Sequence, residues 1–430
     1  MTASPENISS EIGQTDRLAE AATTSPTPAP QKLGVPGVII NWLRALARDE
    51  SVRAATFAFV LTRSLILFLF ILTAQLQIVN PEIVNPEVGA TVITLHKVQL
   101  SRIITRRVTV ADINWYRDTA KLGYERRPFT TEKQANWAFF PLFPLLWYLA
   151  SHITGEYHFS GMAISAIFFF FALLLLHKTI LEFGWNVPDA NRTIFYLAAF
   201  PVSYFFSLPL TESLFLFLTI GCFYAAKRKA WLLAGILGAL ASATRITGVL
   251  LLPALFIVYW QTYRTLRPRL NILPLLLIPT GLLSFMFFLY RITGNAFAFK
   301  DIGVTWGREP AYFLKPLYDY LSDPLLLASP WDFRLINFLA ATTVLSCGLV
   351  LLKWRHWSLA FYTLACMFVA LSSSLLQSQA RYAMVVFPAF IVLGVAGRRP
   401  HVDTAIRTTS LILLVLITIM FCLRLDISLS

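Results

Sequence analysis

The feature that most constrains this chain is a succession of apolar runs along nearly its whole length, each able to cross or enter a lipid bilayer as a helix. A helix satisfies every backbone N–H and C=O within its own segment, as a lipid environment requires. The composition agrees, since 57% of the residues are apolar and only 14% are charged, and this excludes an ordinary soluble domain. The runs are Ala54 to Ala74, Met162 to Leu181, Ile194 to Ser207, Leu214 to Ala226, Trp231 to Ala243, Gly248 to Trp260, Leu273 to Tyr290, Ile336 to Leu352, Leu359 to Leu376, Ala383 to Val395 and Leu411 to Leu423.

The fold class predicted from these runs is all-α, a polytopic membrane bundle of about 11–12 hydrophobic helices. A single transmembrane domain over residues 54–426 accounts for nearly all the chain. Residues 1–36 are rich in Ser, Thr, Ala and Pro without an apolar core, so we expect a disordered cytoplasmic tail. Residues 37–53 place apolar and basic side chains on opposite helical faces, which favours an interfacial amphipathic helix. The alternative is that 37–53 forms the first turns of the next helix.

Charge predicts the topology. The net charge of +13 comes from short basic clusters between apolar runs, where the positive-inside rule expects them, so we predict no nucleic-acid partner. The chain is expected in a plasma membrane of the bacterial inner-membrane type. The clusters expected in the cytoplasm are Arg44/Arg48/Arg53, Lys227/Arg228/Lys229, Arg264/Arg267/Arg269, Lys353/Arg355/His356 and Arg398/Arg399/Arg407. The connections expected outside are the long loops 75–136 and 291–334 and the turns near Glu212, Arg245 and Arg381.

One apolar stretch, Trp137 to His152, interrupts this alternation. It has about 16 residues and contains Pro141 and Pro144, which lack an N–H and disturb a helix. We predict a short, re-entrant or strongly tilted segment. A full crossing remains the alternative, and it would move either the N-terminus or loop 75–136 to the other side.

The first long loop holds the strongest candidate for chemistry, Asp112, ahead of an aromatic helical segment and the Pro-broken stretch. Asp112 also suits a simpler role as the cap of a helix that starts at Ile113 and ends at Gly123. Asp118 is the fallback acid.

Three further ionisable residues are expected at outward helix ends. Glu212 starts a helix, where the dipole favours a carboxylate, so an ordinary first-turn acid is as reasonable as a site residue. Arg245 and Arg381 sit at outward ends, and either could simply extend to the interface. Because these residues come from separate helix ends on one predicted side, a shared outward-facing site is geometrically allowed.

The order of these motifs resembles the phosphatidylinositol-glycan class V mannosyltransferases and their bacterial relatives, which belong to the GT-C glycosyltransferase superfamily. The similarity covers about Ala54 to Val395. One position departs from the family pattern, because Ala111 stands where a Trp usually precedes the acid. The motifs are Asp112…Trp115-Tyr116…Ala120…Gly123-Tyr124, Phe139-Phe140-Pro141…Phe143-Pro144, Thr211-Glu212-Ser213-Leu214-Phe215, Ala243-Thr244-Arg245…Gly248 and Gln379-Ala380-Arg381-Tyr382.

The resemblance implies an inverting transfer of a hexose, mannose in that family, from a polyprenyl-phosphate donor to a hydroxyl of a lipid or glycan acceptor, within membrane lipid and on the extracytoplasmic face. Asp112 would be the general base, with an apolar pocket raising its pKa toward the working pH. Arg245 or Arg381 would hold the phosphate. The other residues expected to bind substrate are Trp115, Tyr116, Glu212 and Tyr382.

Two other classes of function remain open. A multi-pass transporter or lipid flippase would have the same basic-looped bundle, but transporters tend to place ionisable residues near the bilayer midplane. The second class is a catalytically silent relative that serves as a partner subunit. This alternative stays open because Ala111 replaces the Trp that usually precedes the acid. We predict no metal site and no cofactor, since the His residues are scattered and the four cysteines lie inside apolar runs. A divalent ion bridging Asp112 and the donor phosphate remains an alternative.

Overall fold

The computed structural model describes residues 48–75, 112–264, 270–324 and 334–423. The expectations for residues 1–36, for most of 37–53, for 76–111 with Ala111, and for the end of the 291–334 loop therefore lie outside the described residues. The chain divides into two units after Asp49, and only the second, which begins at Glu50, is considered below.

The described residues from Glu50 onward are helical almost throughout, as predicted, and the β pairing found there is one isolated bridge between Pro310 and Ser373. Among them, six helical stretches are long and apolar enough to cross a membrane. The multi-pass, all-α prediction is therefore confirmed. The six stretches are Glu50–Thr73, Phe159–Glu182, Ile246–Tyr263, Leu270–Thr293, Arg334–Lys353 and Pro400–Cys422.

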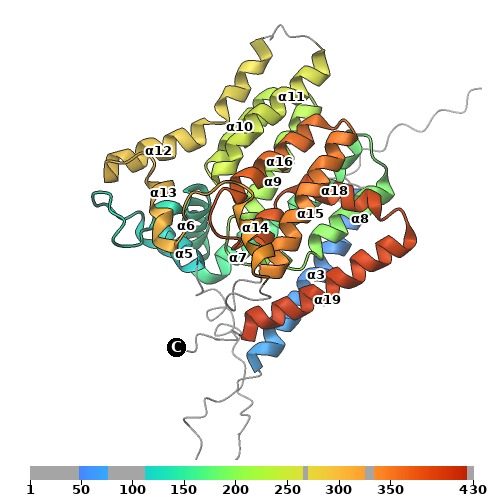
Figure 1. Ribbon diagram of the computed structural model, residues 1–430, viewed down its shortest axis with the longest axis horizontal. Helices are drawn as coiled ribbons and strands as arrows, with labels where there is room; N and C mark the ends of the chain where they lie inside the picture. The colour runs from blue at the N-terminus through green and yellow to red at the C-terminus, as the bar shows by residue number, and fades with distance from the viewer. Residues whose placement is uncertain (1–47, 76–111, 265–269, 325–333, 424–430) are drawn as a thin grey trace, which may run out of the picture. The chain divides into compact units, whose positions relative to one another are not determined.

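The helices of the bundle keep the order of the predicted runs (Figure 1). The longer ones are α3 (Glu50–Gln75), α7 (Tyr157–Glu182), α9 (Glu212–Lys227), α11 (Leu251–Tyr263), α12 (Thr280–Thr293), α15 (Arg334–Lys353), α16 (Trp357–Leu371) and α19 (Pro400–Leu423). The shorter ones are α5 (Asp112–Leu122), α6 (Leu142–Thr154), α8 (Val187–Ala198), α10 (Trp231–Ser242), α13 (Ala298–Asp301), α14 (Lys315–Ser322), α17 (Gln379–Ala383) and α18 (Phe387–Ala396). Short 3₁₀-helices link them: η2 (Asn136–Ala138), η3 (Ser203–Ser207), η4 (Ile246–Leu250), η5 (Leu270–Leu277) and η6 (Ile302–Trp306).

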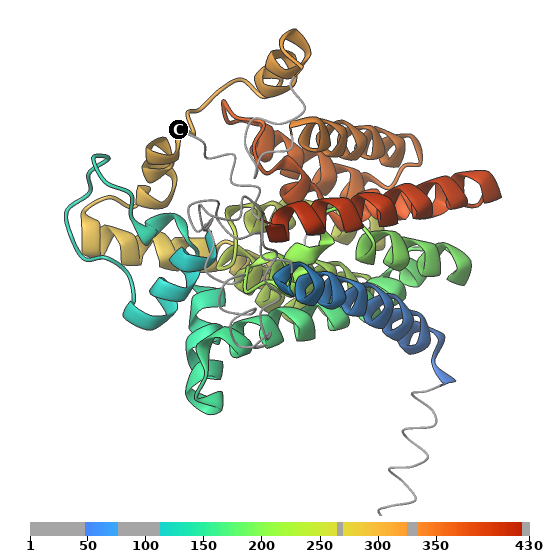
Figure 2. The same ribbon diagram turned by 90° about the horizontal axis from the view of Figure 1, so that it is seen from below.

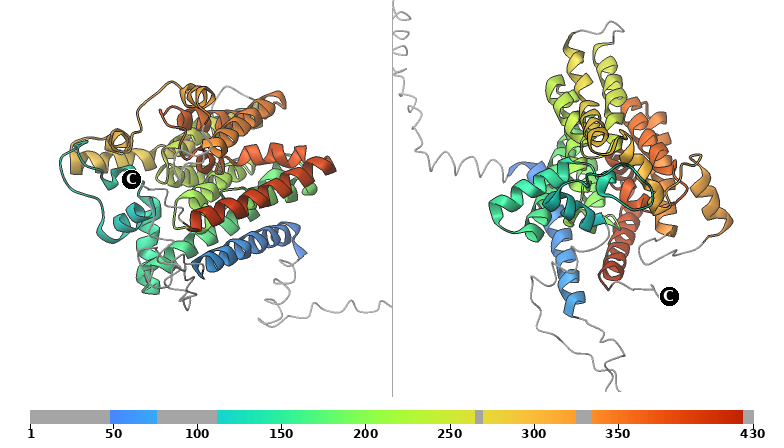
Figure 3. Two further views of the ribbon diagram at one scale, coloured as in Figure 1. Left: turned by 60° about the horizontal axis from the view of Figure 1, so that its bottom comes forward. Right: turned by 90° about the vertical axis from the view of Figure 1, so that its left-hand side faces the viewer.

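The core lies around α9, which is buried along most of its length and packs against α7 and α10. Helices α3 and α19, from opposite ends of the described chain, run next to each other (Figures 1 and 2). The short helices α5 and α6 gather with α12 and α13 at one end of the bundle (Figure 3). That end holds the candidate site.

The stretch from Trp137 to His152 is short, as predicted. It consists of η2 and the 13-residue helix α6. Pro141 and Pro144 stand at the start of α6, where a missing backbone N–H breaks no helical hydrogen bond. At about 1.5 Å per residue, α6 is too short to cross a bilayer of about 30 Å.

The predicted helix from Ile194 to Ser207 is wrong as a single helix. Helix α8 ends at Ala198, and η3 follows after Pro201, which cannot donate a helical hydrogen bond. The guanidinium of Arg63 in α3 takes up carbonyls freed by this break, with Nη2 2.9 Å from the oxygen of Ala198 and Nη1 2.7 Å from that of Ser203. A buried polar side chain from a distant helix therefore allows the interruption.

Close packing between α10 and the start of α12 depends on Gly281. A Cβ built there would lie 2.0 Å from the carbonyl oxygen of Ala239 and 2.7 Å from the nitrogen of Ala243. We expect Gly281→Ala to lower the free energy of unfolding by about 1–3 kcal/mol, because neither backbone can yield cheaply. The measurement is the thermal unfolding midpoint of the purified protein. Gly303→Ala is the control, since its nearest neighbour lies 3.8 Å away, and an equal loss in both variants would contradict this account.

Candidate active site

Asp112 is the first residue of α5, a helix whose sequence explains both its ends and its orientation. Ile113, Tyr116 and Ala120 form its buried face, and Gly123 ends it in the left-handed region at φ +77°. The loop that follows is fixed by Asn136, which donates to the carbonyl of Gly123 at 2.9 Å and accepts from the amide of Glu125 at 3.0 Å. The carboxylate of Asp112 stands at the exposed end of this anchored helix, with its side chain 43% exposed.

Glu212 is the first residue of α9, as predicted, and its side chain is fully buried. It is more than a first-turn acid favoured by the helix dipole. Its Oε1 accepts hydrogen bonds from Nε of Arg381 and, at 3.2 Å, from Nη2 of Arg245. Its Oε2 is buried with no partner among the described residues. A buried carboxylate is tolerated here because two guanidinium groups face it.

Arg381 joins the two acids. It lies in α17, its side chain is 11% exposed, and it donates through Nη1 to Asp112 and through Nε to Glu212. The alternative in which Arg381 and Arg245 simply reach out to the interface is wrong. Arg245 is 15% exposed, paired with Glu212, and stands over the ring of Tyr382 at 5.5 Å.

Arg308 completes a charged cluster of five residues, Asp112, Glu212, Arg245, Arg308 and Arg381. Its Nη1 donates to the hydroxyl of Tyr382 at 2.9 Å, and its positive charge helps to lower the pKa of Asp112. Arg308 is held there because its loop pairs with the segment before α17: the amide of Ser374 donates to the carbonyl of Glu309 at 2.8 Å. Sequence reasoning missed Arg308, although it lies in the second predicted outward loop.

Aromatic rings pack around Trp115, which lies one helical turn after Asp112 in α5. The ring of Trp115 stacks on Phe139 at 5.8 Å and meets Trp306 edge-on at 5.9 Å. Trp306 was also missed, and it belongs to none of the motifs of the resemblance. Flat apolar rings beside hydrogen-bonding charges are a common setting for a polar ligand with an apolar face. The substrate-binding role of Trp115 stays a prediction.

Tyr116 and Asp118 differ in their relation to the charged cluster. Tyr116 packs against Phe139 and Phe143, and burial raises its pKa to about 12. The charges of Arg245 and Glu212 also act on its hydroxyl, so Tyr116 lies in the core beside the charged cluster. Asp118 pairs with its neighbour Arg117 at 2.9 Å. The structure gives Asp118 no contact with the charged cluster.

The protonation of Asp112 differs from expectation. Burial raises its pKa, but the charge and hydrogen bond of Arg381, with the charges of Arg308 and Arg245, outweigh burial, so the pKa lies below the usual value for aspartate. The predicted upward shift is therefore wrong in direction, because the pocket around the carboxylate is cationic rather than apolar. Asp112 is ionised at neutral pH and can accept a proton without first losing one.

Three guanidinium groups and two carboxylates leave the charged cluster with one net positive charge. Arg245 also has a buried Nη1 without a partner among the described residues. The charged cluster can therefore bind an anion such as a phosphate diester. The carboxylate of Asp112 would lie next to an anion bound there. Within the described ranges, no group of three or more His, Cys, Asp or Glu side chains is arranged to hold a metal ion.

Comparisons with known proteins give distant likenesses only. No protein-family model and no curated protein matches the chain. Solved structures with a similar arrangement include ArnT from Cupriavidus metallidurans bound to undecaprenyl phosphate, at 14% identity and a TM-score of 0.47 over 80% of this chain and 60% of that chain. They also include the oligosaccharyltransferase of Archaeoglobus fulgidus in the apo form, at 13% identity and a TM-score of 0.42 over 85% of this chain and 56% of that chain. The chain thus spans about 60% or less of the length of these proteins, and the likeness is too distant to assign an activity.

Proposed function

We propose that this protein is a membrane glycosyltransferase with a GT-C-type fold. It moves a hexose, mannose by its resemblance to the class V family, from a polyprenyl-phosphate donor to a hydroxyl of a lipid or glycan acceptor at the extracytoplasmic face. The observation that carries the proposal is the charged cluster, in which an accessible carboxylate and three arginines meet at the end of the bundle. Asp112, Glu212, Arg245 and Arg381 each belong to a motif of the resemblance, and all four are members of the charged cluster.

The proposed reaction is a single displacement at the anomeric carbon. The acceptor oxygen forms a bond to that carbon while the bond from the carbon to the donor phosphate oxygen breaks. The acceptor proton passes to the carboxylate of Asp112, and the electron pair of the broken bond stays on the lipid phosphate. Because its pKa is low, Asp112 is a weak base, so its contribution comes from placement beside the attacking hydroxyl and grows as that hydroxyl becomes acidic.

The leaving phosphate gains negative charge as the sugar departs, and fixed positive groups lower the energy of that change. Arg308 is exposed, and among the described residues its side chain donates a hydrogen bond to Tyr382 alone, so it is the arginine best placed to bind the phosphate. Arg381 is already held by two acids, and we assign it the role of positioning Asp112. This differs from the sequence-based expectation, in which Arg245 or Arg381 holds the phosphate.

The position of the charges supports an enzyme over a transporter. The charged cluster is built from α5, the start of α9, the turn before η4, the loop after η6 and α17, and none of its residues lies within the six long apolar stretches. Ionisable groups that carry a substrate through a membrane are expected at mid-depth.

The test uses purified protein in vesicles with radiolabelled polyprenyl-phosphate mannose and a panel of lipid and glycan acceptors. The proposal predicts release of polyprenyl phosphate with the label on an acceptor. Movement of the intact donor between leaflets, with no bond broken, would instead establish a flippase.

Replacing Arg308 with Gln is expected to weaken donor binding while the protein stays as stable as wild type. The side chain is exposed, so little packing is lost, but a charge-assisted contact of about 1.5–3 kcal/mol is removed from the phosphate. This corresponds to a rise in KM for the donor of about tenfold or more. Arg291→Gln, at an exposed arginine at the end of α12, is the control. Equal KM values for the two variants would remove Arg308 from the phosphate site.

A further inference from the structure

A polar pocket lies at the far end of α9 from the charged cluster. Helix α9 runs from Glu212 in the cluster to Lys227 in this pocket, and its 16 residues span about 24 Å at 1.5 Å per residue. The pocket has a volume of about 220 Å³, several times that of one water molecule. It lies at the end that the basic connections place in the cytoplasm.

The pocket is positively charged. Lys227 and Arg355 line it together with His356, and no carboxylate partner is described for either cation in the ranges that the structure covers. The nearby acid Glu182 pairs instead with Arg228 at 3.0 Å. Burial and the charge of Lys227 both lower the pKa of His356, as a local excess of positive charge requires.

Hydrogen-bond donors point to the same pocket from the start of α16. The first helical bond of α16 runs from the amide of Ala360 to the carbonyl of His356, and His356 caps no amide with its side chain. The amides of the first turn are therefore available to an anion. Ser358 lines the pocket, is 1% exposed, and has a buried hydroxyl with no partner in the described structure. A bound oxyanion in this cationic pocket would give the buried hydroxyl of Ser358 a hydrogen-bond partner.

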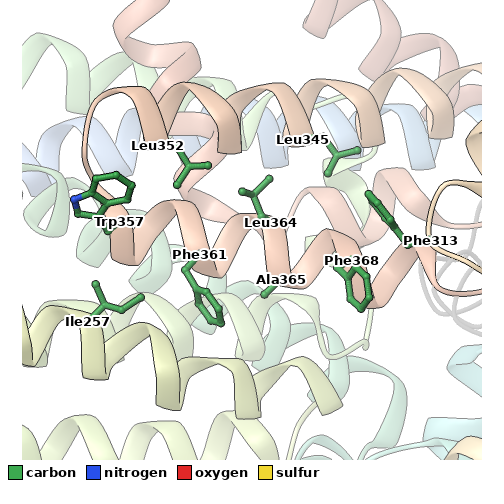
Figure 4. Close-up of a pocket in the computed structure, with 9 residues that line it drawn as sticks. All are labelled: Ile257, Phe313, Leu345, Leu352, Trp357, Phe361, Leu364, Ala365 and Phe368. Carbon is green, nitrogen blue, oxygen red and sulfur yellow. The ribbon is translucent and has the colours of Figure 1, made fainter.

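An apolar groove is lined by chain neighbours of the residues that line this pocket. Ile257 and Trp357 line the groove, while their chain neighbours Val258, His356 and Ser358 line the pocket. The groove runs along α16 between α11 and α15 as far as Phe313 and has a volume of about 620 Å³ (Figure 4). A cationic pocket whose lining residues neighbour those of an apolar groove fits a molecule with an anionic head and a hydrocarbon chain.

We propose that this pocket binds the phosphate of an anionic phospholipid whose acyl chain lies in the groove between α11, α15 and α16. The site is separate from the sugar-transfer site and independent of the proposed function. Lys227, Arg355, the hydroxyl of Ser358 and the amides at the start of α16 hold the phosphate. A free phosphate would leave the groove unexplained, and a neutral lipid would leave the charges unexplained.

The test is native mass spectrometry of the delipidated full-length protein titrated with phosphatidylglycerol. We expect Lys227→Gln with Arg355→Gln to weaken binding about tenfold or more, from the loss of two charge-assisted contacts. The control is Lys229→Gln with Lys353→Gln, which removes the same charge from the same two connections outside the pocket. An equal loss in the control would show a general attraction to basic loops and would overturn the proposal.

Two further variants separate the other outcomes. Ala365→Trp fills the groove and is expected to weaken phosphatidylglycerol binding. If inorganic phosphate competes with the lipid and Ala365→Trp binds both as wild type does, the site is one for free phosphate and the lipid proposal fails. Arg355→Gln alone keeps the test available should the double variant not fold, because Arg355 is exposed. Asp112→Asn should bind phosphatidylglycerol like wild type, because the lipid site is separate from Asp112. The outcome of the lipid test therefore does not depend on whether the protein transfers a hexose.

Discussion

Arg381→Met is expected to cause the largest loss of stability of any single change in the charged cluster. Arg381 is buried and pairs with Asp112 and Glu212, and Glu212 has no exposed side-chain surface. Removing the arginine leaves a buried carboxylate with Arg245 alone, and breaking a buried pair in this way costs about 3–5 kcal/mol. The thermal unfolding midpoint of purified protein should fall accordingly, and transfer should be lost because Asp112 loses its positioning contact.

A second substitution isolates the electrostatic cause. Arg381→Lys keeps a positive charge between the two acids but loses the guanidinium fork, so this variant should unfold at a higher temperature than Arg381→Met. Transfer should stay low, because a lysine cannot hold Asp112 and Glu212 in the same geometry. A lysine variant no more stable than Arg381→Met would mean that lost packing, and not lost charge, accounts for the effect.

Much of the architecture could be predicted from the sequence because lipid imposes simple rules. Apolar runs marked most of the helices, and the two prolines indicated that the stretch from Trp137 to His152 is short. The break between α8 and η3 could not be predicted, because it depends on Arg63, more than a hundred residues away, to satisfy freed carbonyls. Such a compensation appears only when the helices are packed.

The candidate site shows the same division. Asp112, Glu212, Arg245 and Arg381 could be found because each stands at a helix end in a recognisable motif. The ion pairs among these residues could not be predicted from the sequence. These pairs lower the pKa of Asp112 and make Arg381 a partner of two acids, which changes the chemistry expected of both residues. Arg308 carries no motif and reaches the cluster through loop pairing, so only the folded structure shows its proximity.

The second large effect is expected from Asp112→Asn. An asparagine keeps the shape and can still accept from Arg381, and the side chain is 43% exposed, so the fold should persist. It cannot accept the acceptor proton, and loss of a general base lowers kcat by about a hundredfold to ten-thousandfold. Asp118→Asn is a close control: the side chain of Asp118 is 46% exposed on the same helix, and among the described residues its ion pair is with Arg117 alone.

The account is tested most directly by the initial rate of hexose transfer from labelled polyprenyl-phosphate mannose, measured side by side for wild type, Asp112→Asn and Asp118→Asn at matched unfolding midpoints. The expected result is transfer by wild type and by Asp118→Asn at similar rates, with Asp112→Asn at least about a hundredfold slower. Transfer by Asp112→Asn at the wild-type rate would contradict the assignment of Asp112 as the base.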